Sequence, residues 1–251
     1  MSDSRAVLVT GGSRGIGRAI AHAFAAEGNR VAVHWGTSRE RAEAVLAELP
    51  GDGHALVQAD LADADAVGRM VDEAAAALGG LDVLVNNAGV FTAHPPLSVS
   101  YEEWQAAWSR TLAVNLLGAA NATFRAVPHL VAAGGGAVVN VSSRGAFRGE
   151  PDTPAYGASK AGLNAFGQSM ALALAPHGIS VGTVAPGFVQ TEMAREVLDG
   201  PGGDAVRAQS PYGRVARPEE VASAVLWLAS PGARFSTGTI IDVNGASYLR
   251  S

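Results

Sequence analysis

A tyrosine and a lysine stand four positions apart in the stretch PAYGASKAG, at Tyr156 and Lys160. On a helix, side chains at positions i and i+4 leave the same face about one turn apart, so a phenol and an ammonium would meet. A free tyrosine has a pKa of about 10, and a nearby ammonium lowers that pKa by favouring the phenolate. The pair therefore indicates a tyrosine able to act as a general acid or base, although a tyrosine packed on a lysine stem would show the same spacing.

A pair of serines ends the predicted strand in VVNVSSRG and places Ser143 thirteen positions before Tyr156. In open α/β sheets, ligands bind at the carboxyl ends of the strands. A hydroxyl in that place can donate a hydrogen bond to a carbonyl oxygen. Ser143 is thus a candidate for orienting a substrate oxygen beside Tyr156.

The stretch TGGSRGIG follows the first predicted strand and spaces Gly11, Gly15 and Gly17 as G-x3-G-x-G before a helical run. Glycines allow positive φ and a close approach to a pyrophosphate, whose charge then meets the N–H groups of the helix N-terminus. We interpret the turn as a dinucleotide-binding site, although glycine turns also begin βα units that bind no ligand. It lacks the Lys-Ser/Thr of a nucleotide-triphosphate P-loop, which disfavours a kinase or GTPase.

The end of the second predicted strand indicates which dinucleotide would bind. NAD is normally held there by a carboxylate on its ribose diol, but VHWGTSR contains no Asp or Glu. The segment offers Trp35, Thr37, Ser38 and Arg39 instead, and Arg14 projects from the glycine turn. Cations and hydroxyls suit a 2′-phosphate, so NADP(H) is the preferred cofactor and NAD(H) the alternative. Trp35 would stack on the adenine or obstruct it, and both arginines could instead be ordinary surface side chains.

These groups need a sheet to position them. Seven β-branched runs indicate buried strands: RAVLVTG at 5, RVAVHW at 30, HALVQAD at 54, LDVLVNNAG at 81, GAVVNVSS at 136, ISVGTVAPG at 179 and GTIIDVNG at 238. Alanine-rich segments with helical spacing lie between them, at about 15–28, 38–49, 63–79, 101–132, 155–176 and 217–230. The alternation predicts an α/β fold, a single doubly wound Rossmann domain over residues 1–251, with a seven-stranded, mostly parallel sheet and helices on both faces. The Gly/Pro-rich segment 199–218 is expected to be a lid or binding loop, with a merely mobile segment as the alternative.

Composition excludes several classes of function. The 251 residues carry a net charge of −5 and no run of Lys or Arg, so nucleic acid is not an expected partner. The absence of cysteine excludes disulfides, thiolate metal sites and cysteine nucleophiles, and the six histidines show no ligand spacing, so we expect no metal. Neither a secretory signal nor a membrane-spanning stretch appears, which predicts a soluble, cytoplasmic protein without a membrane partner.

Taken together, the motifs resemble the short-chain dehydrogenase/reductase family, and in particular its 3-oxoacyl-ACP reductase-like members. The stretches TGGSRGIG, NNAG, NLLG, VSS, YGASK and APGFVQT follow in the family's order between residues 10 and 191, and RPEEVASAVLWLAS and TGTIIDVNG extend the match toward the C-terminus. The resemblance implies an oxidoreductase that transfers a hydride between NADP(H) and a carbonyl or alcohol substrate. One departure is Gly182, where the family often has Asn four residues before the proline of the PG motif.

The resemblance also implies roles for single residues. Tyr156 would be the general acid in carbonyl reduction and the base in alcohol oxidation, while Lys160 would bind the nicotinamide ribose and lower the tyrosine pKa. Ser143 would orient the substrate oxygen. Asn115 would hold a water that links Lys160 to solvent, with an ordinary interhelical hydrogen bond as the alternative. The further cofactor-binding residues that the motifs imply are Ser13, Ile16, Asp60, Leu61, Asn87, Ala88, Gly89, Pro186, Gly187, Val189 and Thr191.

Substrate specificity is expected from three loops above the catalytic edge, at 90–100, 144–154 and 188–213. Apolar walls would come from four aromatic side chains: Phe91, Phe147, Phe188 and Tyr212. Arg148, Glu150 and His94 could bind polar groups or face water. The implied substrate is a small ketone or aldehyde with its alcohol, and a β-ketoacyl thioester, a polyketide-like ketone, a sugar and a steroid all stay open.

Two further expectations concern assembly and the competing function. Relatives pair helices such as 101–132 and 155–176 between subunits, so we expect a homotetramer, with a dimer as the alternative. The competitor to an enzyme is a catalytically silent NAD(P)-binding protein that senses redox state or binds a partner. The complete set of Asn115, Ser143, Tyr156 and Lys160 favours the enzyme, because a pure binding protein has no chemical need for all four.

Overall fold

The computed structural model describes residues 4–250, and at its centre lies a sheet of seven strands that are all parallel. The strands are β1 (Ala6–Val9), β2 (Arg30–Trp35), β3 (Ala55–Gln58), β4 (Val83–Asn86), β5 (Gly136–Val141), β6 (Ile179–Pro186) and β7 (Ile240–Val243). Their order is β3-β2-β1-β4-β5-β6-β7, so the chain reverses direction across the sheet between β1 and β4. Ligands bind at such a switch point, outside the carboxyl ends of the strands. The prediction of a mostly parallel sheet is confirmed, and every strand pair in the sheet is parallel.

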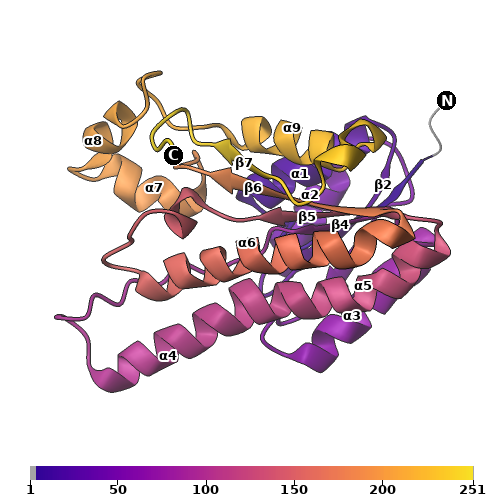
Figure 1. Cartoon of the computed structure of the whole chain (residues 1–251), viewed down its shortest axis with the longest axis horizontal. Coiled ribbons are helices and arrows are strands. Elements are labelled where there is room, and N and C mark those ends of the chain that lie inside the picture. The colour runs from indigo at the N-terminus through magenta and orange to yellow at the C-terminus, as the bar shows by residue number, and fades with distance from the viewer. Residues whose placement is uncertain (1–3, 251) are drawn as a thin grey trace.

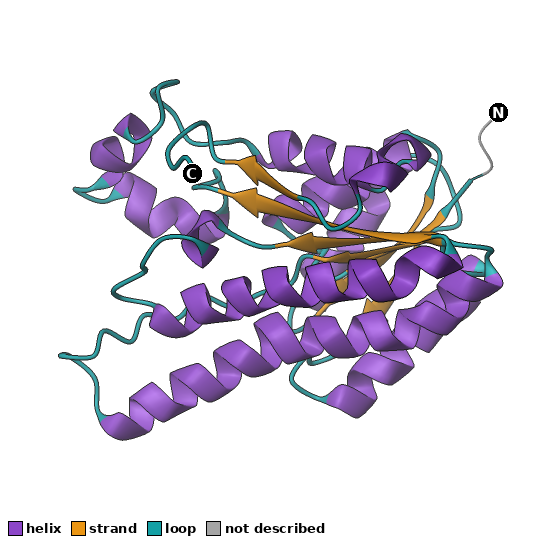
Figure 2. Ribbon diagram, in the orientation of Figure 1, coloured by secondary structure: helices purple, strands orange, loops and turns teal. Residues whose placement is uncertain are grey.

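Helices cover both faces of the sheet (Figures 1 and 2). One face carries α1 (Gly15–Ala26), α2 (Arg39–Glu48) and α9 (Pro218–Leu228). The other carries α3 (Ala64–Leu78), α5 (Ala119–Ala132) and α6 (Pro154–Leu174), with α4 (Tyr101–Leu112) continuing the line of α5. Two short helices, α7 (Glu192–Asp199) and α8 (Gly203–Ala208), lie beyond the carboxyl ends of the strands. This arrangement leaves the carboxyl edge of the sheet between α6 on one side and α7 and α8 on the other.

The strands separate two hydrophobic cores. In β1, Ala6 and Leu8 face the core under α3, α5 and α6, whereas Val7 and Val9 face the core under α1 and α9, and all four are fully buried. Successive side chains of a strand point to opposite faces, so a strand covered on both sides must be apolar throughout. Each fully buried Val or Leu side chain stabilises the fold by about 1.5–3 kcal/mol, which fixes the strand ends and the groups attached to them.

Two elements differ from the sequence-based expectation. The segment 199–218 was expected to be a loop, but it contains α8, so that part of the prediction is wrong. The predicted helix over 101–132 is continuous but passes through a π-helical turn at Ala113–Gly118. At that turn Gly118 packs on the backbone of Leu61, where a Cβ would come 2.7 Å from the carbonyl oxygen. Glycine at this position lets the helix approach the end of β3 closely.

Candidate active site

Helix α6 brings Tyr156 and Lys160 to the carboxyl edge of the sheet. Pro154 opens the helix, where its missing N–H costs nothing, and the two side chains follow one turn apart. Lys160 is 3% exposed, and its Nζ donates to the carbonyl of Val141 at 2.8 Å and lies 5.7 Å from the centre of the Tyr156 ring. Tyr156 is partly buried and meets the ring of Phe91 edge-on. The helix therefore places a phenol and an amine side by side at the end of β5.

The pKa values of this pair differ from the expectation that Lys160 would lower the pKa of Tyr156. Burial raises the pKa of Tyr156, a hydrogen bond from Ser143 opposes that rise, and the carboxylate of Glu150 adds to it. Burial also lowers the pKa of Lys160 to about 8, and its amine is committed to the Val141 carbonyl. For the protein alone the expectation is therefore wrong, because burial disfavours the phenolate and raises the pKa of Tyr156 instead. The phenol keeps its proton at neutral pH, which is the form a general acid requires.

Ser143 stands where β5 ends and faces Tyr156. Its Oγ accepts a hydrogen bond from the N–H of Gly145 at 3.0 Å and so caps the short turn that follows. The same side chain lies close enough to the phenol of Tyr156 to oppose the rise in its pKa. The neighbouring Ser142 donates to the carbonyl of Lys160 at 3.2 Å, which ties β5 to α6. These contacts hold the serine and tyrosine hydroxyls in one place, where both can reach one substrate oxygen.

Asn115 lies in the π-helical turn and is 1% exposed. Its Oδ1 accepts from the N–H of Val90 at 2.7 Å, and its Nδ2 donates to the carbonyl of Val90 at 3.0 Å and to Ser159 Oγ at 3.1 Å. A Cβ on Gly89 would lie 3.3 Å from Asn115 Oδ1 and 3.5 Å from Lys160 Nζ. The side chain thus fastens the loop after β4 to α6 beside Lys160. This is the hydrogen-bonding alternative named above, and the water-holding role stays a prediction.

The glycine turn after β1 packs closely against two other loops. Gly11 and Gly15 have φ of +64° and +53°, which favour glycine. A Cβ on Gly17 would lie 2.2 Å from the carbonyl oxygen of Gly11 and 2.5 Å from Nδ2 of Asn87, and one on Gly15 would lie 3.3 Å from Thr191 Cγ2. The turn, the loop after β4 and the loop after β6 therefore meet. A turn without side chains leaves room for the pyrophosphate of a dinucleotide to approach the backbone N–H groups.

The remaining predicted cofactor residues line the same edge of the sheet. Ser13 and Ile16 lie in the glycine turn and the start of α1, and Asn87 donates from Nδ2 to the carbonyl of Thr10 at 2.8 Å and precedes Ala88. Beyond β6, Gly187 donates its N–H to the carbonyl of Val243 at 3.1 Å. Pro186 ends β6, Val189 is buried and bridges to Ala216, and Thr191 is the residue before α7.

The groups expected around the adenosine are mostly exposed. Thr37 and Arg39 face solvent, Ser38 is partly buried, and the guanidinium of Arg39 is held by Glu43 at 2.7 Å. Arg14 is also exposed and directly precedes α1. Hence Arg14, on the glycine turn itself, is the better placed cation for a 2′-phosphate.

The residues expected near the adenine are Trp35, Asp60 and Leu61. Trp35 ends β2 and is partly buried, and Leu61 is 7% exposed. The carboxylate of Asp60 forms an ion pair with Arg110 at 2.9 Å and accepts from the N–H of Ala62, which together hold the pKa of Asp60 below its usual range. Asp60 is therefore an anion with a fixed orientation.

Sequence reasoning missed His34, a residue of β2 whose ring is hydrogen-bonded to the glycine turn. The ring is 2% exposed, its Nδ1 accepts from the N–H of Gly11 at 2.9 Å, and its Nε2 donates to the carbonyl of Ala59 at 3.2 Å. Because Gly11 must donate, the ring has to be neutral with its proton on Nε2. Burial lowers the pKa of His34 to about 4. A histidine inside the buried run RVAVHW was the only signal in the sequence.

We expect His34 to make the fold less stable as pH falls. The folded-state pKa of about 4 lies below the ordinary value of 6.5, so between these values the unfolded chain binds a proton that the folded chain does not. Stability is therefore lost as pH falls through this window, by about 2 kcal/mol between pH 7 and pH 5. Urea unfolding at both pH values measures the loss. The variant His34→Gln should show a smaller loss, and His177→Gln, at an exposed histidine, should match the unmodified protein; equal losses in all three would contradict the assignment.

His94 also differs from expectation, because it was predicted to bind polar groups or face water but is 1% exposed. Its Nε2 accepts from the N–H of Ala155 at 3.1 Å, its Nδ1 donates to the carbonyl of Thr92 at 2.7 Å, and its ring meets Trp104 edge-on. His94 thus ties the 90–100 loop to the first turn of α6, directly before Tyr156. It is a positioning residue for the helix that carries the phenol.

Residues 4–250 lack two other kinds of feature. No helix there combines the length and the apolar character that a membrane span requires. Nor do those residues contain a group of three His, Cys, Asp or Glu side chains arranged to hold a metal ion.

Known proteins resemble the chain over nearly its whole length. A family model described as Enoyl-(Acyl carrier protein) reductase matches residues 11–246. The 3-oxoacyl-[acyl-carrier-protein] reductase FabG of Staphylococcus aureus is 38% identical over 99% of this chain and 100% of its own. Cis-4-hydroxycyclohexanecarboxylate dehydrogenase of Sinomonas cyclohexanicum is 40% identical over 96% of this chain and 95% of its own. The crystal structure of a short chain dehydrogenase from Burkholderia cenocepacia J2315 in complex with NADP superposes with a TM-score of 0.87, at 38% identity and 97% coverage of both chains.

Proposed function

The chain belongs to the short-chain dehydrogenase/reductase family of oxidoreductases, and we propose on that basis that it transfers a hydride between NADP(H) and a carbonyl or alcohol substrate. The observation that carries the proposal is the meeting of Ser143, Tyr156 and Lys160 at the edge that also holds the glycine turn. A phenol, a hydroxyl and an amine at the switch point of a parallel sheet suit proton transfer to a carbonyl oxygen.

The cofactor and three side chains have separate parts in the proposed reaction. NADPH, when bound, supplies the hydride. Tyr156 gives its proton to the carbonyl oxygen as the carbon is reduced, and Ser143 donates a hydrogen bond to the same oxygen. The resulting phenolate lies beside Lys160, whose amine stabilises the charge and whose pKa of about 8 lets it return a proton near neutrality. In the direction of alcohol oxidation Tyr156 begins as the base and the same steps run in reverse.

For the cofactor we propose NADP(H) in preference to NAD(H). Arg14 is exposed on the turn that would cradle the pyrophosphate, and no carboxylate follows β2 before Glu40 to bind a ribose diol. The NADP found in the Burkholderia cenocepacia protein supports this choice.

We expect NADPH to bind more tightly than NADH in a fluorescence titration, and Arg14→Ala to remove most of that preference. Loss of one charge-assisted hydrogen bond to the 2′-phosphate should weaken NADPH binding about tenfold or more. NADH affinity should stay unchanged. Arg39→Ala is the matched control and should change NADPH affinity less, because Glu43 already holds that guanidinium. Equal or tighter binding of NADH by the unmodified protein would refute the preference.

A screen for NADPH oxidation against carbonyl compounds tests the function itself. The panel should include a 3-oxoacyl thioester and 4-oxocyclohexanecarboxylate, because the relatives named above are a 3-oxoacyl reductase and a dehydrogenase of the corresponding hydroxy acid. We expect turnover of at least one compound. Tight NADPH binding with no turnover of any member would favour the competing function, a catalytically silent sensor or interaction protein.

For the assembly we propose a homotetramer, with a dimer as the alternative. Large apolar side chains are exposed on the helices expected to pair, including Phe124 on α5 and Leu172 on α6, which are 75% and 83% exposed. Apolar surface of this kind supports a subunit contact. Light scattering that reports a monomer at micromolar concentration would refute the proposal.

A further inference from the structure

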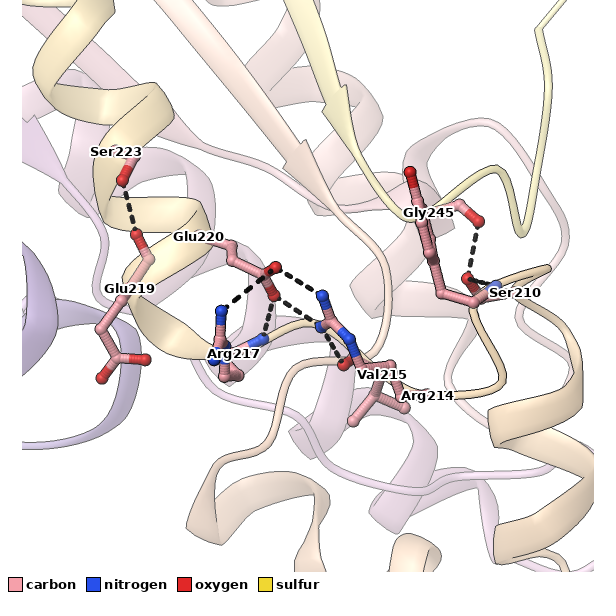
Figure 3. Close-up of polar contacts among 9 residues, drawn as sticks. Ser210, Arg214, Val215, Arg217, Glu219, Glu220, Ser223 and Gly245 are labelled. Atoms are coloured by element: carbon pink, nitrogen blue, oxygen red, sulfur yellow. Dashed lines mark hydrogen bonds and ion pairs between the residues drawn. The ribbon is translucent and has the colours of Figure 1, made fainter.

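A small cavity of about 210 Å³ lies between the ends of β6 and β7 and the segment that follows α8. Ser210, which accepts from the N–H of Tyr212 and donates to the carbonyl of Gly245, stands on one side, and Arg214 with its partner Glu220 on the other (Figure 3). Neither Tyr156 nor Ser143 lines this cavity. The space is thus distinct from the hydroxyl groups assigned to hydride chemistry.

The wall nearest the catalytic edge is formed by Arg144, the residue after Ser143. Its side chain is buried, with the whole residue only 4% exposed. Nη1 donates to Gln209 Oε1 and to Ser247 Oγ, both at 2.8 Å, and the guanidinium lies 5.3 Å from the centre of the Phe188 ring. Both acceptors are neutral, and no carboxylate of residues 4–250 comes within ion-pair distance of it. The N–H groups on Nε and Nη2 find no acceptor among those residues either.

The other charged groups that line the cavity already have partners. Arg214 and Glu220 form an ion pair at 2.7 Å, and Asp242 pairs with Arg250 at the same distance. Arg144 therefore contributes one positive charge that forms no ion pair with a carboxylate of residues 4–250. Burial and, to a smaller extent, the positive charge of Arg148 lower the pKa of Arg144, and Glu150 opposes these effects only in part. An uncompensated buried cation is costly, and a bound anion would remove that cost.

We propose that this cavity binds a small organic carboxylate through Arg144. The planar guanidinium presents parallel N–H groups that match the two oxygens of a carboxylate. The apolar side chains of Phe188, Val206 and Val243 in the lining suit an organic body rather than a bare inorganic ion. The site goes beyond the proposed hydride transfer, since its ligand contacts none of the catalytic hydroxyls and binds whether or not the cofactor reacts.

Calorimetry on the full chain tests the site without any activity measurement. The probes are sodium benzoate, succinate and acetate, with sodium chloride at equal ionic strength and sodium phosphate as comparisons. We expect at least one carboxylate to bind, and Arg144→Met to weaken its binding by about tenfold or more. Arg69→Met removes an exposed arginine of α3 that does not line the cavity, and it should bind like the unmodified protein. Should Arg144→Met fail to fold, Arg144→Lys keeps the charge, loses the paired N–H groups, and is expected to bind more weakly than the unmodified protein.

Three results would overturn the proposal: no carboxylate binding beyond the chloride control, equal binding by the unmodified protein and the Arg144 variant, or phosphate binding as tightly as every carboxylate. A competition assay then distinguishes the source of the anion. A carboxylate that raises KM for the carbonyl compound found in the screen occupies the place of the substrate's own acid group. A carboxylate that binds and leaves KM unchanged is a separate ligand. Either result is consistent with a carboxylate site at Arg144.

Discussion

Replacing Tyr156 with phenylalanine lowers kcat for carbonyl reduction by about 100- to 10,000-fold, the range that positioned general acids contribute. The variant keeps the ring and its edge-on contact with Phe91 but loses the phenolic proton beside Ser143. Ser143 cannot replace it readily, because a serine hydroxyl is a far weaker acid than a phenol. Steady-state kinetics on the compound found in the screen measures the loss.

NADPH affinity separates a lost proton donor from a damaged fold. Lys160 and the glycine turn are untouched in Tyr156→Phe, so the dissociation constant for NADPH should stay within about twofold. Tyr101→Phe removes the hydroxyl of an exposed tyrosine and should leave kcat and NADPH affinity unchanged. Near-normal turnover by Tyr156→Phe would mean that another group supplies the proton.

Replacing Gly17 with alanine is expected to damage cofactor binding most. The new Cβ would lie 2.2 Å from the carbonyl oxygen of Gly11 and 2.5 Å from Nδ2 of Asn87, and neither the backbone of the turn nor the Asn87 side chain, which is bonded to Thr10, moves freely. Opening the turn should weaken NADPH binding by more than about tenfold. The overpacking should also lower the free energy of unfolding by about 1–3 kcal/mol.

The same substitution at Gly202 serves as the matched control. That residue has nothing within 4 Å of an added Cβ and a φ of −88°, so alanine fits there without strain. Fluorescence titration with NADPH and urea unfolding should find Gly202→Ala unchanged. If Gly17→Ala also bound NADPH normally, the glycine turn would not be the dinucleotide-binding site.

Most of the architecture could be predicted because local patterns decide it. Every strand of the sheet follows from a β-branched run between alanine-rich helices, and burial on both faces forces β1 to be apolar throughout. The positive φ of Gly11 and Gly15 likewise follows from glycine spacing after a strand. In each case the determining residues are neighbours in the chain.

The remaining features depend on contacts between residues far apart in the sequence. His34 acts on Gly11 from a neighbouring strand, and His94 reaches Ala155 across 61 positions, so neither pattern is visible locally. The pKa direction of Tyr156 could not be predicted either, since it depends on how deeply the phenol is buried and on Glu150, not on the spacing to Lys160. The uncompensated charge of Arg144 needs the whole cavity wall to be recognised.

Hydride transfer to a carbonyl carbon can be followed directly with deuterium. NADPH carrying deuterium at C4 of the nicotinamide, prepared separately in each of its two stereochemical forms, is incubated with the protein and the carbonyl compound found in the screen. We predict one deuterium per turnover on the former carbonyl carbon from one form and none from the other. Product without deuterium from either form, or with deuterium at a carbon of a reduced C=C bond, would contradict the proposed reaction.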